Sequence, residues 1–123
     1  MNLDRRLAAA ASLVRPGKRV CDVGTDHGYL PVYLTEQGVY GRCTASDIHE
    51  QPLSSARETI REHGMLSQID LVCTDGLRDI PESAAEDIVI CGMGGELIAR
   101  ILADCAYLSK PGHRLMLQPM TRA

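Results

Sequence analysis

The sequence contains no Trp and no Phe, and four tyrosines are its only Phe/Tyr/Trp-type aromatic residues. Without large aromatic rings, the core of a folded domain must be built mainly from Leu, Ile, Val, Ala and Met. Hydrophobic residues make up 45% of the chain and charged residues 24%, a balance typical of globular domains. The length of 123 residues suits one domain with a core of its own.

Paired-cysteine motifs and long apolar runs are also absent. Five cysteines contain no CxxC pair, and the first four fall on separate predicted strands: Cys21, Cys43, Cys73, Cys91 and Cys105. This distribution favours buried free thiols over a zinc site or a disulfide framework, so we expect no metal. No segment is long and apolar enough to span a bilayer. The Ala-rich start, closed by Arg15-Pro16, does not resemble a signal peptide. We expect a cytoplasmic protein with no membrane association.

The formal net charge of −3 is small, but the charges are unevenly distributed. Five basic residues in the first segment accompany a single acid, Asp4: Arg5, Arg6, Arg15, Lys18 and Arg19. A basic rim of this kind could bind phosphates. A solvated helix face explains the same residues and is the more common case.

Short apolar runs bounded by Gly, Pro or Asp predict strands. Five such runs occur: Arg19–Val23, Cys43–Asp47, Ile69–Thr74, Asp87–Cys91 and Arg114–Gln118. They lack the alternation of polar and apolar residues, which favours strands covered on both faces.

Helical spacing of apolar residues predicts helices over residues 2–15, 27–37 and 51–63, and another from residue 96 onward. Residues 77–86 are interrupted by Pro81, so we expect only a turn there. The alternation of strands and helices predicts a doubly wound, Rossmann-like α/β domain over residues 1–123, with a mainly parallel sheet of about five strands. The chain stops just after its fifth predicted strand, leaving little to cover one face of it. We therefore expect the front part of a longer protein rather than a complete small domain.

Acids and glycines gather where the predicted strands end. In open parallel sheets, ligands bind at the carboxyl ends of the strands, near the point where strand order reverses. The four loops at these ends span Asp22–Gly28, Ser46–Ile48, Thr74–Leu77 and Cys91–Gly95. We expect them to share one crevice.

The first of these turns has the chemistry of a site for a cationic or zwitterionic ligand. Gly24 and Gly28 leave room for a ligand against the backbone, and the following helix presents free N–H groups. The spacing D-x-G-x-x-x-G differs from the dinucleotide pattern G-x-G-x-x-G, and Asp22 and Asp26 would repel a pyrophosphate. Asp47 is placed to accept both hydroxyls of a ribose.

Asp75 and Gly76 could flank an adenine, with the carboxylate accepting from the exocyclic amine. Together these requirements describe S-adenosylmethionine. Each residue also has a simpler explanation: Asp26 or Asp47 could cap a helix, and His27 could be an exposed residue at a helix start. The four loops taken together favour a binding site.

Five segments of the chain resemble successive blocks of a bacterial enzyme family. They read VCDVGTDHGYLPVYL, ASDIHEQPLSSARETI, CTDGL, DIVICGMGGELIARIL and LMLQPM. The family comprises the tRNA (adenine-22-N1)-methyltransferases, class I enzymes that use S-adenosylmethionine. The resemblance runs in order from Leu3 to Met120 and is carried most specifically by GTDHGYLP and GMGGELI. Family members continue with further strands and a helical extension implicated in tRNA binding, both of which are missing here.

The resemblance implies roles for individual residues. Cofactor binding is expected for Asp22, Gly24, Thr25, His27, Gly28, Asp47, Ile48, Asp75, Gly76 and Gly92. Substrate binding is expected for Met93 and Gly94 from the same resemblance, and for Tyr29, Arg5 and Arg6 from their places beside the first turn and in the basic first segment. The Gly92–Gly95 segment occupies the position where many amino-methylating relatives carry an Asn-Pro-Pro-Tyr-like motif, and its absence fits attack by a ring nitrogen.

Methylation of adenine N1 needs no prior deprotonation, because the ring lone pair can attack the methyl group directly. The product base is cationic, so we predict Asp26 as the carboxylate that stabilises it. Because N1 is paired in a duplex, the base must be exposed or flipped, and Tyr29 is a candidate to stack on it. The alternative is a non-catalytic S-adenosylmethionine-binding or assembly module. The glycine spacing disfavours a nicotinamide-dependent oxidoreductase.

Overall fold

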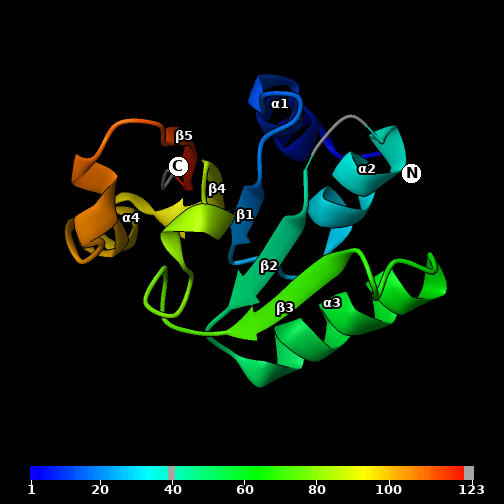
Figure 1. The fold of residues 1–123 in the computed structure, drawn as a ribbon. Helices are drawn as coiled ribbons and strands as arrows, with labels where there is room; N and C mark the ends of the chain where they lie inside the picture. Colours follow the sequence, from blue (N-terminus) through cyan, green and yellow to red (C-terminus); the bar gives the residue numbers. More distant parts are fainter. Residues whose placement is uncertain (39–40, 121–123) are drawn as a thin grey trace.

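The computed structural model describes residues 1–38 and 41–120, which form a five-stranded parallel sheet covered by helices (Figure 1). The strand order is β3-β2-β1-β4-β5, and every neighbouring pair is parallel. The strands are β1 (Val20–Val23), β2 (Cys43–Asp47), β3 (Ile69–Cys73), β4 (Asp87–Gly94) and β5 (Arg114–Met120). The predicted doubly wound α/β fold is confirmed.

Four α-helices lie where the apolar spacing predicts them, with shifted ends. They are α1 (Arg5–Leu13), α2 (Tyr29–Gln37), α3 (Glu50–Glu62) and α4 (Gly95–Ala103). The first helix begins three residues later than predicted because Asp4 caps it, accepting a hydrogen bond from the Leu7 N–H at 2.8 Å. The start of α2 is delayed because Gly28 holds a left-handed conformation with φ of 75°.

Two connections contain short 3₁₀ helices. Residues 77–86, predicted as a turn, include η1 (Glu82–Ala84) directly after Pro81. A second, η2 (Ala106–Ser109), follows α4. β4 runs past its predicted end at Cys91 to Gly94, with an irregular register to β5 over this stretch.

The helices divide between the two faces of the sheet. α1, α2 and α3 contribute Ala10, Leu34 and Ile60 to a core cluster on one face. α4 contributes Ile98 and Ile101 to the cluster on the other face. The chain winds outward from β1 to β3 and then returns to β4 on the other side of β1 (Figure 1). The topological switch point therefore lies between β1 and β4.

The edge strands are less covered than the sequence predicts. β5 exposes Leu115 and Leu117, at 39% and 40% of their surface, on the side that faces α4. Cys73, at the end of edge strand β3, is exposed rather than buried. An apolar run without alternation therefore predicts burial correctly for the central strands and wrongly for the edges, because burial depends on strand order.

A buried ion pair joins the end of α1 to the start of β4. Asp87 is fully buried and accepts from the Arg15 side chain, through Nε at 2.8 Å and Nη2 at 2.5 Å, and from the Arg15 backbone N–H at 2.7 Å. Arg15 is thus committed to the fold and does not belong to a free basic rim. Among residues 1–38 and 41–120, no helix combines the length and apolar character needed to cross a membrane.

Candidate functional site

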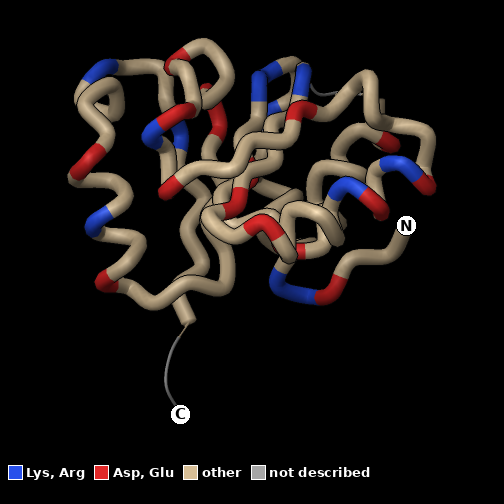
Figure 2. The backbone as a smooth tube through the Cα atoms, turned by 90° about the horizontal axis from the view of Figure 1, so that it is seen from below, with Lys and Arg blue, Asp and Glu red and all other residues tan. Residues whose placement is uncertain are grey.

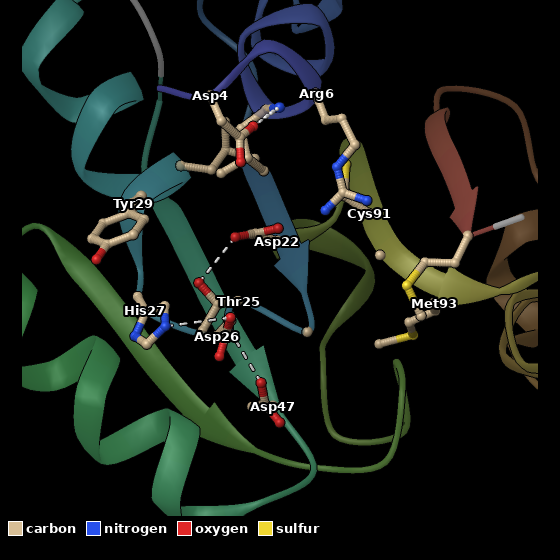
Figure 3. A pocket seen from close by; sticks show the side chains of 15 residues that line it. Asp4, Arg6, Asp22, Thr25, Asp26, His27, Tyr29, Asp47, Cys91 and Met93 are labelled. Carbon is tan, nitrogen blue, oxygen red and sulfur yellow. Dashed lines mark hydrogen bonds and ion pairs between the residues drawn. The ribbon is translucent and has the colours of Figure 1, made fainter. Parts of the chain in front are cut away.

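A cavity of about 390 Å³ lies at the carboxyl ends of β1 and β4, at the switch point of the sheet (Figure 3). Ligands bind at this position in open α/β sheets. Ten of its lining residues belong to the sequence-based set of site residues: Arg6, Asp22, Gly24, Thr25, Asp26, His27, Tyr29, Asp47, Gly92 and Met93. The topology thus brings β1, the tip of β2, the end of β4 and α1 together around one hollow.

The turn after β1 is held close to the tip of β2. The backbone N–H groups of Gly24 and Thr25 donate to the Ser46 carbonyl at 2.9 and 2.8 Å. Gly24 has φ of 74°, and a Cβ atom built on it would lie 2.6 Å from Met93 Cε. Asp26 has φ of 55° and is the one non-glycine residue at positive φ in the described chain. The positive φ favours glycine at position 24, and a side chain there would displace the Met93 methyl group from the cavity wall.

Asp22 is the buried acid of the cavity. It is 5% exposed, and Thr25 Oγ1 donates to its Oδ2 at 2.9 Å. Burial raises the pKa of Asp22 to about 7, the Thr25 bond opposes the rise, and the nearby carboxylates of Asp47 and Asp26 add to it. A cation bound beside Asp22 would therefore stabilise the ionised form of this buried carboxylate.

Asp47 lies beside the first turn, at the tip of β2. Its Oδ2 accepts from the Asp26 N–H at 3.3 Å, and its Oδ1 from the His49 N–H at 3.2 Å. Each oxygen keeps a further lone pair. The carboxylate is thus oriented by backbone while it can still accept from a hydroxyl group.

His27 and Tyr29 form a stacked pair at the mouth of the cavity, with ring centroids 5.3 Å apart (Figure 3). The His27 ring is oriented by Ser55 of α3, whose Oγ lies 2.8 Å from Nδ1. Tyr29 is 44% exposed. The pair offers an accessible ring surface beside Asp26.

α1 supplies the wall on the other side. The Arg6 side chain points from α1 into the cavity (Figure 3), and Gln118 Nε2 of β5 donates to the Arg6 carbonyl at 3.1 Å. Neither Arg5 nor Arg6 forms an ion pair within the described part of the chain. Arg6 is therefore the basic side chain of the cavity, whereas Arg5 lies outside its lining.

Four lining residues lie outside the loops and roles expected from the sequence: Asp4, Leu7, Leu30 and Met120. Cys91 belongs to the expected strand-end loop, although no role was assigned to it. Asp4 and Leu7 come from the helix that the charge pattern singled out. No local signal marks them as cavity residues, because their place depends on how α1 packs against β4 and β5.

The expected meeting of Asp22, Asp47 and Asp75 in one hollow is not what the structure shows. Asp75 does not line the main cavity and instead pairs with Arg100 of α4, Oδ1 to Nη2 at 2.7 Å. Gly76 beside it packs on Ile101. The cause is the position of β3 at the sheet edge, two strands away from the switch point.

Three further residues of the sequence-based set lie outside the lining. Gly28 is packed on α3, because a Cβ atom there would lie 3.1 Å from the Ala56 backbone. Ile48 is 51% exposed beyond the tip of β2. Gly94 ends β4. Their assignments as binding residues stay predictions.

The basic side chains do not gather into one patch. Figure 2 shows Lys and Arg distributed around the backbone and interleaved with Asp and Glu. Several are paired, as in Arg42 with Asp70 at 2.7 Å and Lys18 with Glu86 at 3.9 Å. Within residues 1–38 and 41–120, no group of three His, Cys, Asp or Glu is arranged to hold a metal ion.

Comparison with protein families gives a match over residues 3–123 to a methyltransferase domain. The chain belongs to this family. The methyltransferase domain is 35% identical to the tRNA (adenine(22)-N(1))-methyltransferase of Bacillus subtilis (strain 168), over 100% of this chain and 52% of that protein.

Solved structures extend the likeness to three dimensions. A Streptococcus pneumoniae protein in complex with S-adenosyl-L-methionine is 37% identical, with a TM-score of 0.87 over 98% of this methyltransferase domain and 57% of that chain. The crystal structure of the tRNA methyltransferase TrmK of B. subtilis is 36% identical, with a TM-score of 0.88 over 96% of the domain and 50% of that chain. The domain thus spans about half the length of these relatives.

Proposed function

We propose that this methyltransferase domain binds S-adenosylmethionine in the switch-point cavity and serves methyl transfer to N1 of adenine in tRNA, at position 22. The observation that carries the proposal is the pair of carboxylates, Asp22 and Asp47, which the neighbouring strands β1 and β2 bring to one cavity. The family match and the relatives named above support it.

The donor set fits the cofactor group by group. Asp22, with its raised pKa, suits the ammonium of the methionine part. Gly24 has no side chain to keep a ligand away from the backbone, and Thr25 lines the cavity beside it. Asp47 suits the ribose hydroxyls. Further cofactor contacts are proposed for His27, Gly28, Ile48, Asp75, Gly76 and Gly92. When bound, the cofactor supplies an activated methyl group on sulfur.

On the protein side, the reaction requires positioning rather than proton removal. Adenine N1 attacks through its in-plane lone pair, so the cavity walls need only align base and methyl group. We assign to Asp26 the stabilisation of the cationic product, because its side chain is 69% exposed at the cavity and its turn is fixed by Asp47. Unchanged single-turnover rates in an Asp26→Asn variant of an active enzyme would exclude this role.

The tRNA contacts are proposed for the rim. Tyr29 offers a ring on which a base can stack, Met93 and Gly94 border the end of β4, and Arg5 and Arg6 provide cations on α1. Replacement of both arginines by Gln is expected to weaken tRNA binding and to flatten its salt dependence, because each lost phosphate contact reduces the slope by about one. An unchanged tRNA affinity with an unchanged salt dependence in this variant would exclude Arg5 and Arg6 as phosphate contacts.

Calorimetry with S-adenosylhomocysteine and NAD, side by side, tests cofactor binding. We expect heat of binding for the first alone, because Asp22 and Asp26 repel a pyrophosphate. The reverse result would favour an oxidoreductase. Transfer of labelled methyl to tRNA then separates an enzyme from the second candidate, a non-catalytic cofactor-binding module.

A further inference from the structure

Two adjacent residues of α4 hold the loop that follows β3. Arg100 Nη2 donates to Asp75 Oδ1 at 2.7 Å, and Nη1 lies 3.4 Å from Oδ2. At the next position, Gly76 has φ of 62°, and a Cβ atom there would lie 2.9 Å from Ile101 Cγ1. The position of this loop is therefore set by α4 and not by β3 alone.

The two oxygens of the Asp75 carboxylate are unequally engaged. Oδ1 forms the short bond, whereas Oδ2 shares Nη1 of Arg100 with Asp104, whose Oδ2 is 3.2 Å from that nitrogen. The bond from Arg100 holds the pKa of Asp75 below its ordinary value, and the side chain is 29% exposed. Arg100 thus presents an ionised carboxylate in one orientation, with acceptor capacity left on Oδ2.

The same helix and loop adjoin the main cavity along the chain. α4 begins at Gly95, two residues after Met93, which lines the cavity together with Gly92. Thr74, the residue before Asp75, donates its N–H to the Asp47 carbonyl at 3.0 Å. Asp75 therefore follows, by one residue, the contact that joins the end of β3 to the tip of β2, where Asp47 lines the cavity.

We propose that Arg100 is a positioning residue for base recognition, holding Asp75 so that Oδ2 accepts a hydrogen bond from the exocyclic amine of the cofactor's adenine. The inference rests on the proposed function and deepens it. A base with a carbonyl oxygen in place of the amine sets an acceptor against this carboxylate and is rejected.

The test compares S-adenosylhomocysteine with S-inosylhomocysteine by calorimetry on the 123-residue chain. The unmodified protein is expected to prefer the adenine form by about tenfold or more. Asp75→Asn should abolish the preference, and Arg100→Gln should reduce it to about threefold or less, because a mobile carboxylate no longer opposes the carbonyl. Arg100→Lys, which keeps the charge without the two-pronged geometry, should restore part of it.

Arg78→Gln is the matched control. Arg78 lines the same small cavity as Asp75 and Arg100 but, in the described structure, donates no hydrogen bond from its side chain to Asp75. Its loss should leave the preference unchanged.

A purely structural role of Arg100 would lower both affinities equally, and an unchanged ratio in Arg100→Gln would overturn the proposal while leaving cofactor binding intact. Failure of the unmodified protein to bind S-adenosylhomocysteine would overturn the proposed function together with this inference.

Discussion

Asp22 and Asp75 are both acids at the carboxyl ends of parallel strands, yet they stand in opposite environments. Asp22 is buried at the switch point with a threonine hydroxyl as its partner, and its pKa is raised to about 7. Asp75 is partly exposed at the sheet edge with a guanidinium as its partner, and its pKa is lowered.

The difference shows that a strand-end acid acquires its chemistry from its neighbours. Asp22 is buried without a cationic partner, so a cation on a bound ligand would stabilise its ionised form. A cation already in place makes Asp75 a fixed hydrogen-bond acceptor. The first arrangement suits the binding of an ammonium group, and the second suits the orientation of a neutral base.

The largest expected effect is on stability and concerns Asp87, an acid that is both buried and paired with an arginine. Asp87 is as buried as Asp22 and, like Asp75, is paired with an arginine, Arg15. Arg15→Gln leaves this buried carboxylate without its cation, so we expect a loss of about 3–5 kcal/mol in the free energy of unfolding. Urea denaturation measures it.

Arg42→Gln is the control, because its pair with Asp70 lies on the surface, with side chains 42% and 49% exposed. We expect a loss below about 1 kcal/mol. Equal losses in the two variants would contradict the view that burial decides the contribution of such pairs.

The raised pKa of Asp22 predicts a pH dependence of stability. The folded carboxyl keeps its proton up to about pH 7, whereas an ordinary carboxyl releases it near 3.8. The folded state therefore binds more protons between these values, and the stability it contributes at acid pH is lost as pH rises through about 7. The loss should be a few kcal/mol in total.

Asp22→Asn should remove this slope in thermal unfolding measured across pH. Asp75→Asn should remove a dependence of stability on pH that has the opposite sign. The pKa of Asp75 is lowered in the folded state, so its contribution to stability is lost as pH falls. S-adenosylhomocysteine should also bind more tightly to the unmodified protein as pH rises through about 7, because the ammonium pairs with the charged form of Asp22. A flat profile for the unmodified protein would refute the raised pKa.

The smallest effect concerns the shape of the wall beside Asp22. Gly24 and Gly38 both have positive φ, at 74° and 69°, but only at Gly24 would a Cβ atom meet another side chain, Met93 Cε at 2.6 Å. Replacement of either by Ala should cost about 1–2 kcal/mol of stability from backbone strain. Only Gly24→Ala should also weaken S-adenosylhomocysteine binding, by several-fold. Equal binding in both variants would remove Gly24 from the site.

Much of the fold could be predicted because its signals are local. Gly38 caps the end of α2, α1 ends shortly before Pro16, and the apolar run Ile88–Ile90 is buried as expected. The turn from Asp22 to Tyr29 could be predicted to border a cavity because its acids and glycines are contiguous. Cys73 and Leu117 could not be placed, since the same apolar pattern serves a central strand and an edge strand.

The sequence by itself determined the order of strands and helices, and it placed an acid at the end of each of the first three strands. Only the tertiary structure decided which of these acids meet. Strand order is set by packing between distant segments, so it separated Asp75 from Asp22 and gave it Arg100, while it brought Arg6 from the far N-terminal helix over the cavity. These pairings cannot be predicted from local sequence, because each depends on surfaces that come together only when the whole sheet has formed.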